Sequence, residues 1–112
     1  MKKDNLVYVE DILNSCNLIA EYTDGVEFDE MIENQMLIDA VIRNIEVIGE
    51  AANKLDEEFK TRNPTFPIRS AVTMRNKLIH DYNEIDYQVV WDTVRVDIPE
   101  LKQLCEELLK NL

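Results

Sequence analysis

The stretch that decides the fold is residues 36–55, MLIDAVIRNIEVIGEAANKL. Its apolar residues recur at intervals of three and four, the spacing that places side chains on one face of an α-helix. The same periodicity reaches back to about residue 29, so the sequence predicts one long amphipathic helix over 29–55. Gly49 lies inside this helix, where glycine costs about 1 kcal/mol relative to alanine. A position without a side chain would allow a second helix to pack closely.

A second amphipathic helix is predicted before this stretch, over residues 5–22, where apolar residues again recur at three-four spacing. Asp4 is the expected N-cap, because a side-chain carboxylate there can accept hydrogen bonds from the free backbone N–H groups of the first turn. The helix is expected to stop at residues 23–25, where Gly25 can adopt the left-handed conformation that ends helices.

The chain after the long helix is divided by prolines. Residues 63–67, Asn-Pro-Thr-Phe-Pro, form the clearest break, because each proline disfavours helical geometry at the residue before it. A third helix is predicted from Ile68 to Ile79 or His80, followed by a polar turn over 81–84. Helical periodicity then runs over 85–109, in which Pro99 either kinks one helix or begins another.

These segments favour an all-α fold. Only 2 glycines and 3 prolines are present, too few for the many tight turns of an all-β protein. Four or five helices with short links predict an antiparallel up-and-down bundle, formed as a single domain over residues 1–112. Since nowhere do about 18 apolar residues run together, we expect a cytoplasmic protein without a membrane span. Cys16 and Cys105 then predict buried reduced thiols rather than a disulfide.

The charge limits the possible partners. The formal net charge is −11, whereas nucleic-acid backbones attract lysine and arginine. Extended, sequence-independent coating of RNA is therefore not expected. Either a few basic residues gather in one cleft, or the acidic surface serves a protein partner.

His80 is the only histidine, which excludes zinc fingers and the His-Glu-x-x-His metalloprotease pattern. No glycine-rich loop exists to hold phosphates. Glu46 and Glu50 are four residues apart and could hold a divalent ion, but such pairs are common on any solvated helix, and a di-metal bundle would also need Glu-x-x-His. The sequence therefore favours no cofactor and no metal site.

Residues 74–82, MRNKLIHDY, are the strongest candidates for catalysis, since they bring together two cations, an amide, the sole imidazole and a phenol. On a continuous helix Arg75 and Tyr82 would nearly eclipse, while His80 would lie about 140° from Arg75 unless the helix ends first. Such a set permits cleavage of RNA by its own 2'-hydroxyl. His80 would transfer the protons and Arg75 would bind the scissile phosphate, without a metal and without activity on DNA.

An ordinary structural role would explain the same residues. Arg75 could pair with Asp81 or Glu84, and His80 could cap the helix C-terminus as a cation. Tyr82 could pack at the helix end with its hydroxyl in water. The spacing of one arginine and one histidine does not by itself separate these roles from catalysis.

The pattern Arg75-x4-His80-x-Tyr82 resembles the signature of the HepT-like toxins of the HEPN superfamily, also called DUF86. The resemblance extends over nearly the whole chain, with departures at Ile68 and Thr73, where the family often has tryptophan and glycine. Other likenesses, in family order, are Asp39-Ala40-Val41, Ile48-Gly49-Glu50-Ala51, the break from Asn63-Pro64 to Pro67, Met74-Arg75-Asn76 and Val90-Trp91.

The resemblance implies a type VII-like toxin, a metal-independent endoribonuclease with tRNA as a possible substrate. Arg75 and His80 would be catalytic, and Asn76 and Lys77 would orient groups or bind phosphate. It also implies a homodimer whose two motifs share a cleft and concentrate positive potential there. The implied antitoxin is a minimal nucleotidyltransferase (MNT) that blocks the toxin by transferring AMP to Tyr82.

Two other functions remain open. The chain could be a non-catalytic substrate-binding or regulatory subunit of a nucleotidyltransferase complex, which would form a tight complex and cleave no RNA. It could also be a structural helical adaptor in which His80 only caps a helix.

Overall fold

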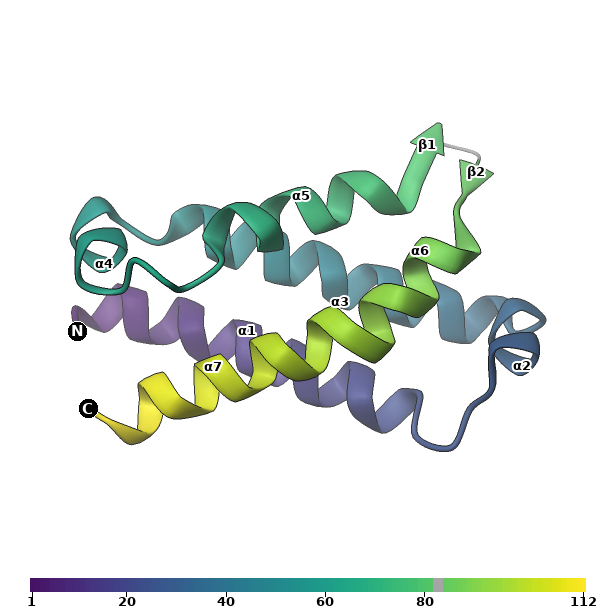
Figure 1. Cartoon of the computed structure of the whole chain (residues 1–112), viewed down its shortest axis with the longest axis horizontal. Coiled ribbons are helices and arrows are strands. Elements are labelled where there is room, and N and C mark those ends of the chain that lie inside the picture. The colour runs from purple at the N-terminus through teal and green to yellow at the C-terminus, as the bar shows by residue number, and fades with distance from the viewer. Residues whose placement is uncertain (82–83) are drawn as a thin grey trace.

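The computed structural model describes residues 1–81 and 84–112, with the side chains of all of these except 79–81. The predicted bundle is present (Figure 1): long helical segments cross the molecule alternately in opposite directions, and both termini lie at the same end. The long segments are α1 (Lys3–Tyr22), α3 (Gln35–Lys54), α5 (Ile68–Leu78) and the continuous run of α6 (Tyr87–Asp92), the π-helix η1 (Thr93–Asp97) and α7 (Ile98–Lys110).

Two short helices make the turns between long ones. α2 (Phe28–Ile32) lies between α1 and α3, and α4 (Glu57–Arg62) lies between α3 and α5, at the opposite end of the bundle (Figure 1). α1 packs against α3 and α7, α3 also packs against α5, and α5 contacts α6. The fold is therefore the all-α, up-and-down bundle that the sequence predicts.

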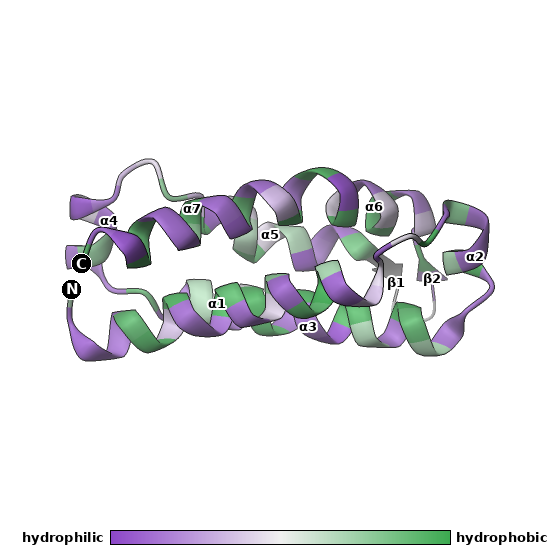
Figure 2. Ribbon diagram, turned by 90° about the horizontal axis from the view of Figure 1, so that it is seen from below, coloured by the Kyte–Doolittle hydropathy of each residue, from purple (hydrophilic) through white to green (hydrophobic). Residues whose placement is uncertain are grey.

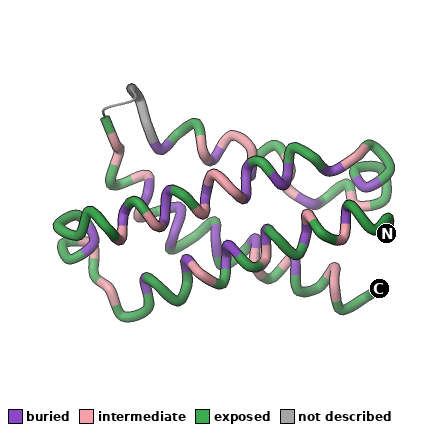
Figure 3. The backbone as a smooth tube through the Cα atoms, turned by 180° about the vertical axis from the view of Figure 1, so that it is seen from behind, coloured by how far each residue is buried: buried purple, intermediate pink, exposed green. Residues whose placement is uncertain are grey.

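The core lies between these helices. Hydrophilic and hydrophobic residues alternate along each long helix (Figure 2), and buried positions recur between exposed ones (Figure 3). Burial of apolar surface is the main favourable contribution to the free energy of folding. The largest fully buried side chains are Ile12, Ile19, Met31, Ile38, Ile45, Ile48, Leu78 and Ile98.

The predicted helix over 29–55 is interrupted near its start. α2 ends at Ile32 and α3 begins at Gln35, because the Asn34 side chain accepts a hydrogen bond from the backbone N–H of Leu37 (3.1 Å) and begins a new helix. The predicted N-cap of the first helix is also wrong. Lys2 occupies that position, and Asp4 lies in the first turn, where its charge still favours the positive end of the helix dipole.

The segment predicted as a polar turn contains a short hairpin. β1 (Ile79–Asp81) pairs antiparallel with β2 (Glu84–Ile85), with Ile79 opposite Ile85. The backbone N–H of Asp86 donates to the carbonyl oxygen of Leu78 (2.9 Å) and closes the base of this hairpin. The hairpin therefore connects the end of α5 directly to the start of α6.

Smaller expectations are confirmed. Gly25 has a φ of 71°, in the left-handed region. Cys16 and Cys105 are free and buried. Pro99 is the second residue of α7 and follows the π-helix η1 within the continuous helical run. Among the described residues, no helix is long and apolar enough to cross a membrane.

Candidate active site on helix α5

The sequence-predicted residues of α5 lie on different sides of the helix. Met74 and Leu78 are buried, Arg75 is half-buried, and Asn76 and Lys77 are exposed. Each residue of an α-helix advances by about 100°, so Arg75 and Lys77 lie on opposite flanks of α5. The structure therefore does not bring the two cations of the motif together within one subunit.

Arg75 lies on the flank that faces α3, where its aliphatic stem packs over Gly49. A Cβ atom placed on Gly49 would lie 3.7 Å from Cβ and 3.8 Å from Cδ of Arg75, and 3.5 Å from the carbonyl oxygen of Ala71. The expected close packing at Gly49 is thus confirmed, and its partner is α5. Contact along the stem restricts the positions that the guanidinium can reach.

The Arg75 guanidinium makes no hydrogen bond or ion pair with any described residue. The alternative that Glu84 pairs with it is therefore not seen, and the side chain of Asp81 lies outside the described residues. A half-buried arginine without a carboxylate partner among the described residues has its planar set of donors available for an external anion such as a phosphate.

His80 and Tyr82 are placed only in part. α5 ends at Leu78, and the backbone of His80 lies in β1, so the 140° separation from Arg75 on a continuous helix does not apply. The side chain of His80 and the whole of Tyr82 lie outside the described residues. Their catalytic, capping and acceptor roles stay predictions.

Lys77 lines a groove of about 290 Å³ between α5 and the run formed by α6, η1 and α7. Asn76 points outward from α5, between the two flanks. Their predicted orienting or phosphate-binding roles also stay predictions. The acidic residues of the groove, which the sequence analysis did not single out, come from segments that are distant in sequence from α5.

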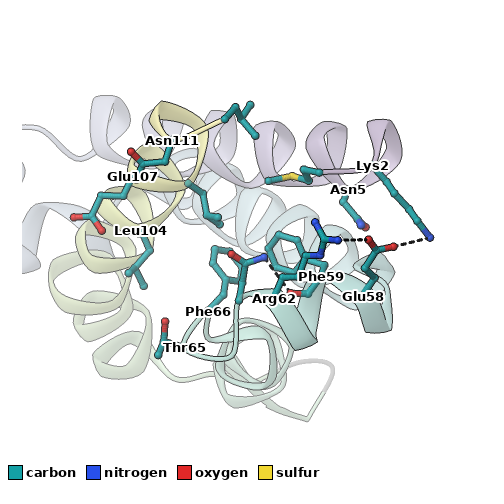
Figure 4. Close-up of a pocket in the computed structure, with 14 residues that line it drawn as sticks. Lys2, Asn5, Glu58, Phe59, Arg62, Thr65, Phe66, Leu104, Glu107 and Asn111 are labelled. Carbon is teal, nitrogen blue, oxygen red and sulfur yellow. Dashed lines mark hydrogen bonds and ion pairs between the residues drawn. The ribbon is translucent and has the colours of Figure 1, made fainter.

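Another cavity, of about 410 Å³, opens at the other end of the bundle between α4 and α7 (Figure 4). Its lining includes Phe59 and Phe66, whose rings are edge to face with centroids 5.4 Å apart. At its edge Glu58 pairs with both Lys2 (3.2 Å) and Arg62 (3.4 Å). No motif residue lines this cavity, so it is separate from the candidate active site.

Comparison with known proteins assigns the family. The family model described as "Ribonuclease HepT-like" matches residues 12–108, which include all of α5 and the hairpin. The chain belongs to the HepT-like ribonuclease family. No solved structure matches it significantly.

Curated relatives of this HepT-like protein cover almost its full length. "Probable ribonuclease HepT" of Thermococcus cleftensis is 41% identical over 110 residues, which are 98% of this chain and 100% of the relative. "Putative RNase MJ0125" of Methanocaldococcus jannaschii is 38% identical over 111 residues, which are 99% and 96% of the two chains. The family and the names of its members thus agree with the predicted ribonuclease, and the roles of Arg75 and His80 stay predictions.

Proposed function

We propose that this HepT-like protein is the toxin of a toxin-antitoxin pair and a metal-independent endoribonuclease. The observation that supports this most is the Arg75 guanidinium, which is seated on α3 through its stem and has no partner among the described residues. It lies one turn before the end of α5, and the chain passes from there directly into the strand that contains His80. One phosphate-binding cation and one proton-transfer group are thereby provided within six residues.

The proposed reaction balances without a cofactor. The 2'-oxygen of the RNA attacks the adjacent phosphorus and His80 accepts the proton of that hydroxyl. The bond to the 5'-oxygen breaks as that oxygen takes a proton from water, and His80 then returns its proton to the solvent. The products are a 2',3'-cyclic phosphate and a 5'-hydroxyl. Arg75 would stabilise the charge that develops on the non-bridging phosphate oxygens.

A homodimer is part of this proposal. With a net charge of −11, a single chain attracts RNA poorly, whereas two motifs facing one cleft would place two copies of Arg75 close together. The cleft would then be locally positive on an otherwise acidic protein.

The proposed inhibitor is a minimal nucleotidyltransferase that modifies Tyr82. The phenol oxygen would attack the α-phosphorus of ATP and release pyrophosphate, which leaves AMP on the tyrosine. The added phosphate charge and bulk would lie close in sequence to Arg75 and His80 and compete with RNA for the same cation.

The test is cleavage of total tRNA in EDTA by the purified protein, with analysis of the product ends. We expect wild type to leave cyclic phosphate, and we expect both His80→Ala and Arg75→Ala to lose activity while they keep the helical circular dichroism spectrum. Arg69→Ala is the matched control, because Arg69 is an exposed arginine of the same helix. Cleavage by His80→Ala at the wild-type rate would contradict the proposal.

The acidic charge supports a second candidate, a non-catalytic regulatory subunit of a nucleotidyltransferase complex. This candidate predicts a stable complex with such an enzyme and no cleavage of tRNA by wild type or any variant. The same assay therefore separates the two functions.

A further inference from the structure

The groove between α5 and the run of α6, η1 and α7 has an apolar floor. Met74 on α5 and Leu101 on α7 are both buried and line it, within a volume of about 290 Å³. A volume of this size can hold several side chains. Grooves between helices that combine an apolar floor with polar edges are suited to side chains from an amphipathic segment.

The edges of this groove are acidic. Asp92, Asp97 and Glu100 line one side and Lys77 lines the other, so the charged residues sum to three negative and one positive. Asp92 accepts a hydrogen bond from the amide of Gln88 (2.9 Å). The carboxylates of Asp97 and Glu100 have no hydrogen bond or ion pair with any described residue.

The groove leads toward the hairpin. One wall is α5 and the other is the run of α6, η1 and α7, and α5 is joined to α6 by β1 and β2, between which residues 82–83 lie in sequence. A segment bound in the groove would therefore approach the hairpin from the α6 side of α5. Arg75, by contrast, lies on the α3 side of the same helix.

We propose that this groove docks a basic amphipathic segment of a partner protein, one that presents lysine or arginine to the acidic edge and apolar side chains to the floor. Charge complementarity selects this occupant, because a phosphate backbone would meet three carboxylates, whereas a basic segment would form ion pairs with them. α5 then separates two surfaces, with RNA on the Arg75 flank and the protein partner on the groove flank. That the partner is the inhibitor acting at Tyr82 rests on the proposed function.

A defined probe tests the groove directly. The probe is a fluorescein-labelled peptide of about 14 residues, made of lysine and leucine with the leucines at helical spacing. Its counterpart has glutamate in place of lysine. Binding to the full chain is followed by fluorescence anisotropy, and the site is located by amide shifts in the ¹⁵N-labelled protein. We expect the lysine peptide to bind, with the largest shifts along α5 and α7 at the groove, and the glutamate peptide not to bind.

Charge variants of the chain test whether the peptide binds in the groove. Asp97→Lys/Glu100→Lys is expected to raise the Kd of the lysine peptide at least roughly tenfold, and Asp97→Asn/Glu100→Gln, which keeps shape and removes charge, should raise it less. Glu10→Lys/Asp11→Lys is the control, because these exposed residues of α1 give the same charge change outside the groove. An equal loss in the control would show attraction to net charge alone and would overturn the proposal.

An RNA outcome is also distinguished. If a single-stranded RNA oligonucleotide displaced the lysine peptide and shifted the same groove amides, the groove would be an RNA site and the proposal would be wrong. Cleavage of tRNA by the wild-type protein is measured on the same preparation. If no tRNA is cleaved, the proposed ribonuclease function is wrong, but the result of the peptide experiment is unaffected.

Discussion

The two glycines of the chain provide opposite tests of the packing between α3 and α5. Gly49 is buried in the interior of α3 without a left-handed φ, and a Cβ there would meet its nearest neighbours at 3.5–3.8 Å, an ordinary van der Waals distance. Alanine would therefore fit and would gain the helix propensity that glycine lacks. We expect Gly49→Ala to raise the free energy of unfolding by about 1 kcal/mol.

Gly25 should respond with the opposite sign. No atom lies within 4 Å of a Cβ placed there, but its φ of 71° is strained for a residue with a side chain. We expect Gly25→Ala to lower the free energy of unfolding by about 1 kcal/mol, from the backbone alone. A longer side chain at Gly49 meets a different limit. Gly49→Leu would drive three further carbons into the Arg75 stem and the Ala71 carbonyl and should cost about 1–3 kcal/mol through overpacking.

The assay is urea denaturation followed by far-ultraviolet circular dichroism, with all three variants measured beside wild type. A gain of 1 kcal/mol should also raise the Tm by roughly 4 °C in a domain of this size. The reasoning would be refuted if Gly49→Ala were less stable than wild type, because α3 and α5 would then lie closer than the Cβ distances allow. A change in the free energy of unfolding of the same sign for Gly49→Ala and Gly25→Ala would also contradict the reasoning.

Three further outcomes are expected. Burial raises the pKa of the Cys16 and Cys105 thiols to about 12. Neither thiol should therefore react with Ellman's reagent at pH 8 until urea unfolds the chain. Prompt reaction in the native state would show that α1 and α7 separate and expose the thiols. The backbone N–H of Phe59 and the amide of Asn5 donate to the Asp56 carboxylate and hold its pKa below the ordinary 3.8. The ionised carboxylate therefore stabilises the folded chain above pH 3.8, and this contribution is lost as the pH falls through the lowered pKa. Thermal unfolding between pH 6 and pH 2.5 should therefore show a steeper loss of Tm for wild type than for Asp56→Asn. Asn5→Ala, which removes two half-buried hydrogen bonds between Asn5 and Asp56 (3.0 and 3.3 Å), should cost about 1 kcal/mol in urea denaturation.

The sequence predicted the helices that have a long apolar periodicity. It did not predict the helix boundary and the hairpin that depend on a few polar or backbone contacts. The helix over 5–22 and the helix that begins at Ile68 follow directly from apolar spacing, although the second ends at Leu78 and not at Ile79 or His80, and the bundle follows from the number of helices and their short links. The break at Asn34 was missed because the apolar pattern continues through it, and only the capping hydrogen bond to Leu37 ends that continuity. The hairpin was missed because its strands are three and two residues long, too short for an alternating pattern to be visible.

The candidate site shows the same division. Sequence identified Arg75 by its neighbours and Gly49 by its lack of a side chain, but it could not pair them, because contact between residues 26 positions apart depends on the register of α3 against α5. The acidic groove was also missed. Asp97 and Glu100 look like ordinary surface residues in a chain with 23 aspartates and glutamates, and only the course of the α6, η1 and α7 run beside α5 brings them to the same groove as Lys77.

The placement of charge around α5 changes how the acidic composition should be interpreted. A net charge of −11 counts against RNA binding if the charge is spread evenly over the surface. Asp97 of η1 and Glu100 of α7, however, line the groove on the Lys77 flank of α5, and on that helix Lys77 and Arg75 lie on opposite flanks. Among the described residues, neither the Arg75 guanidinium on the α3 side nor the carboxylates of Asp97 and Glu100 on the α6 side have a partner. We therefore expect an anionic substrate to favour the α3 side and a basic protein to favour the α6 side, which would let an acidic chain bind both on the two sides of one helix.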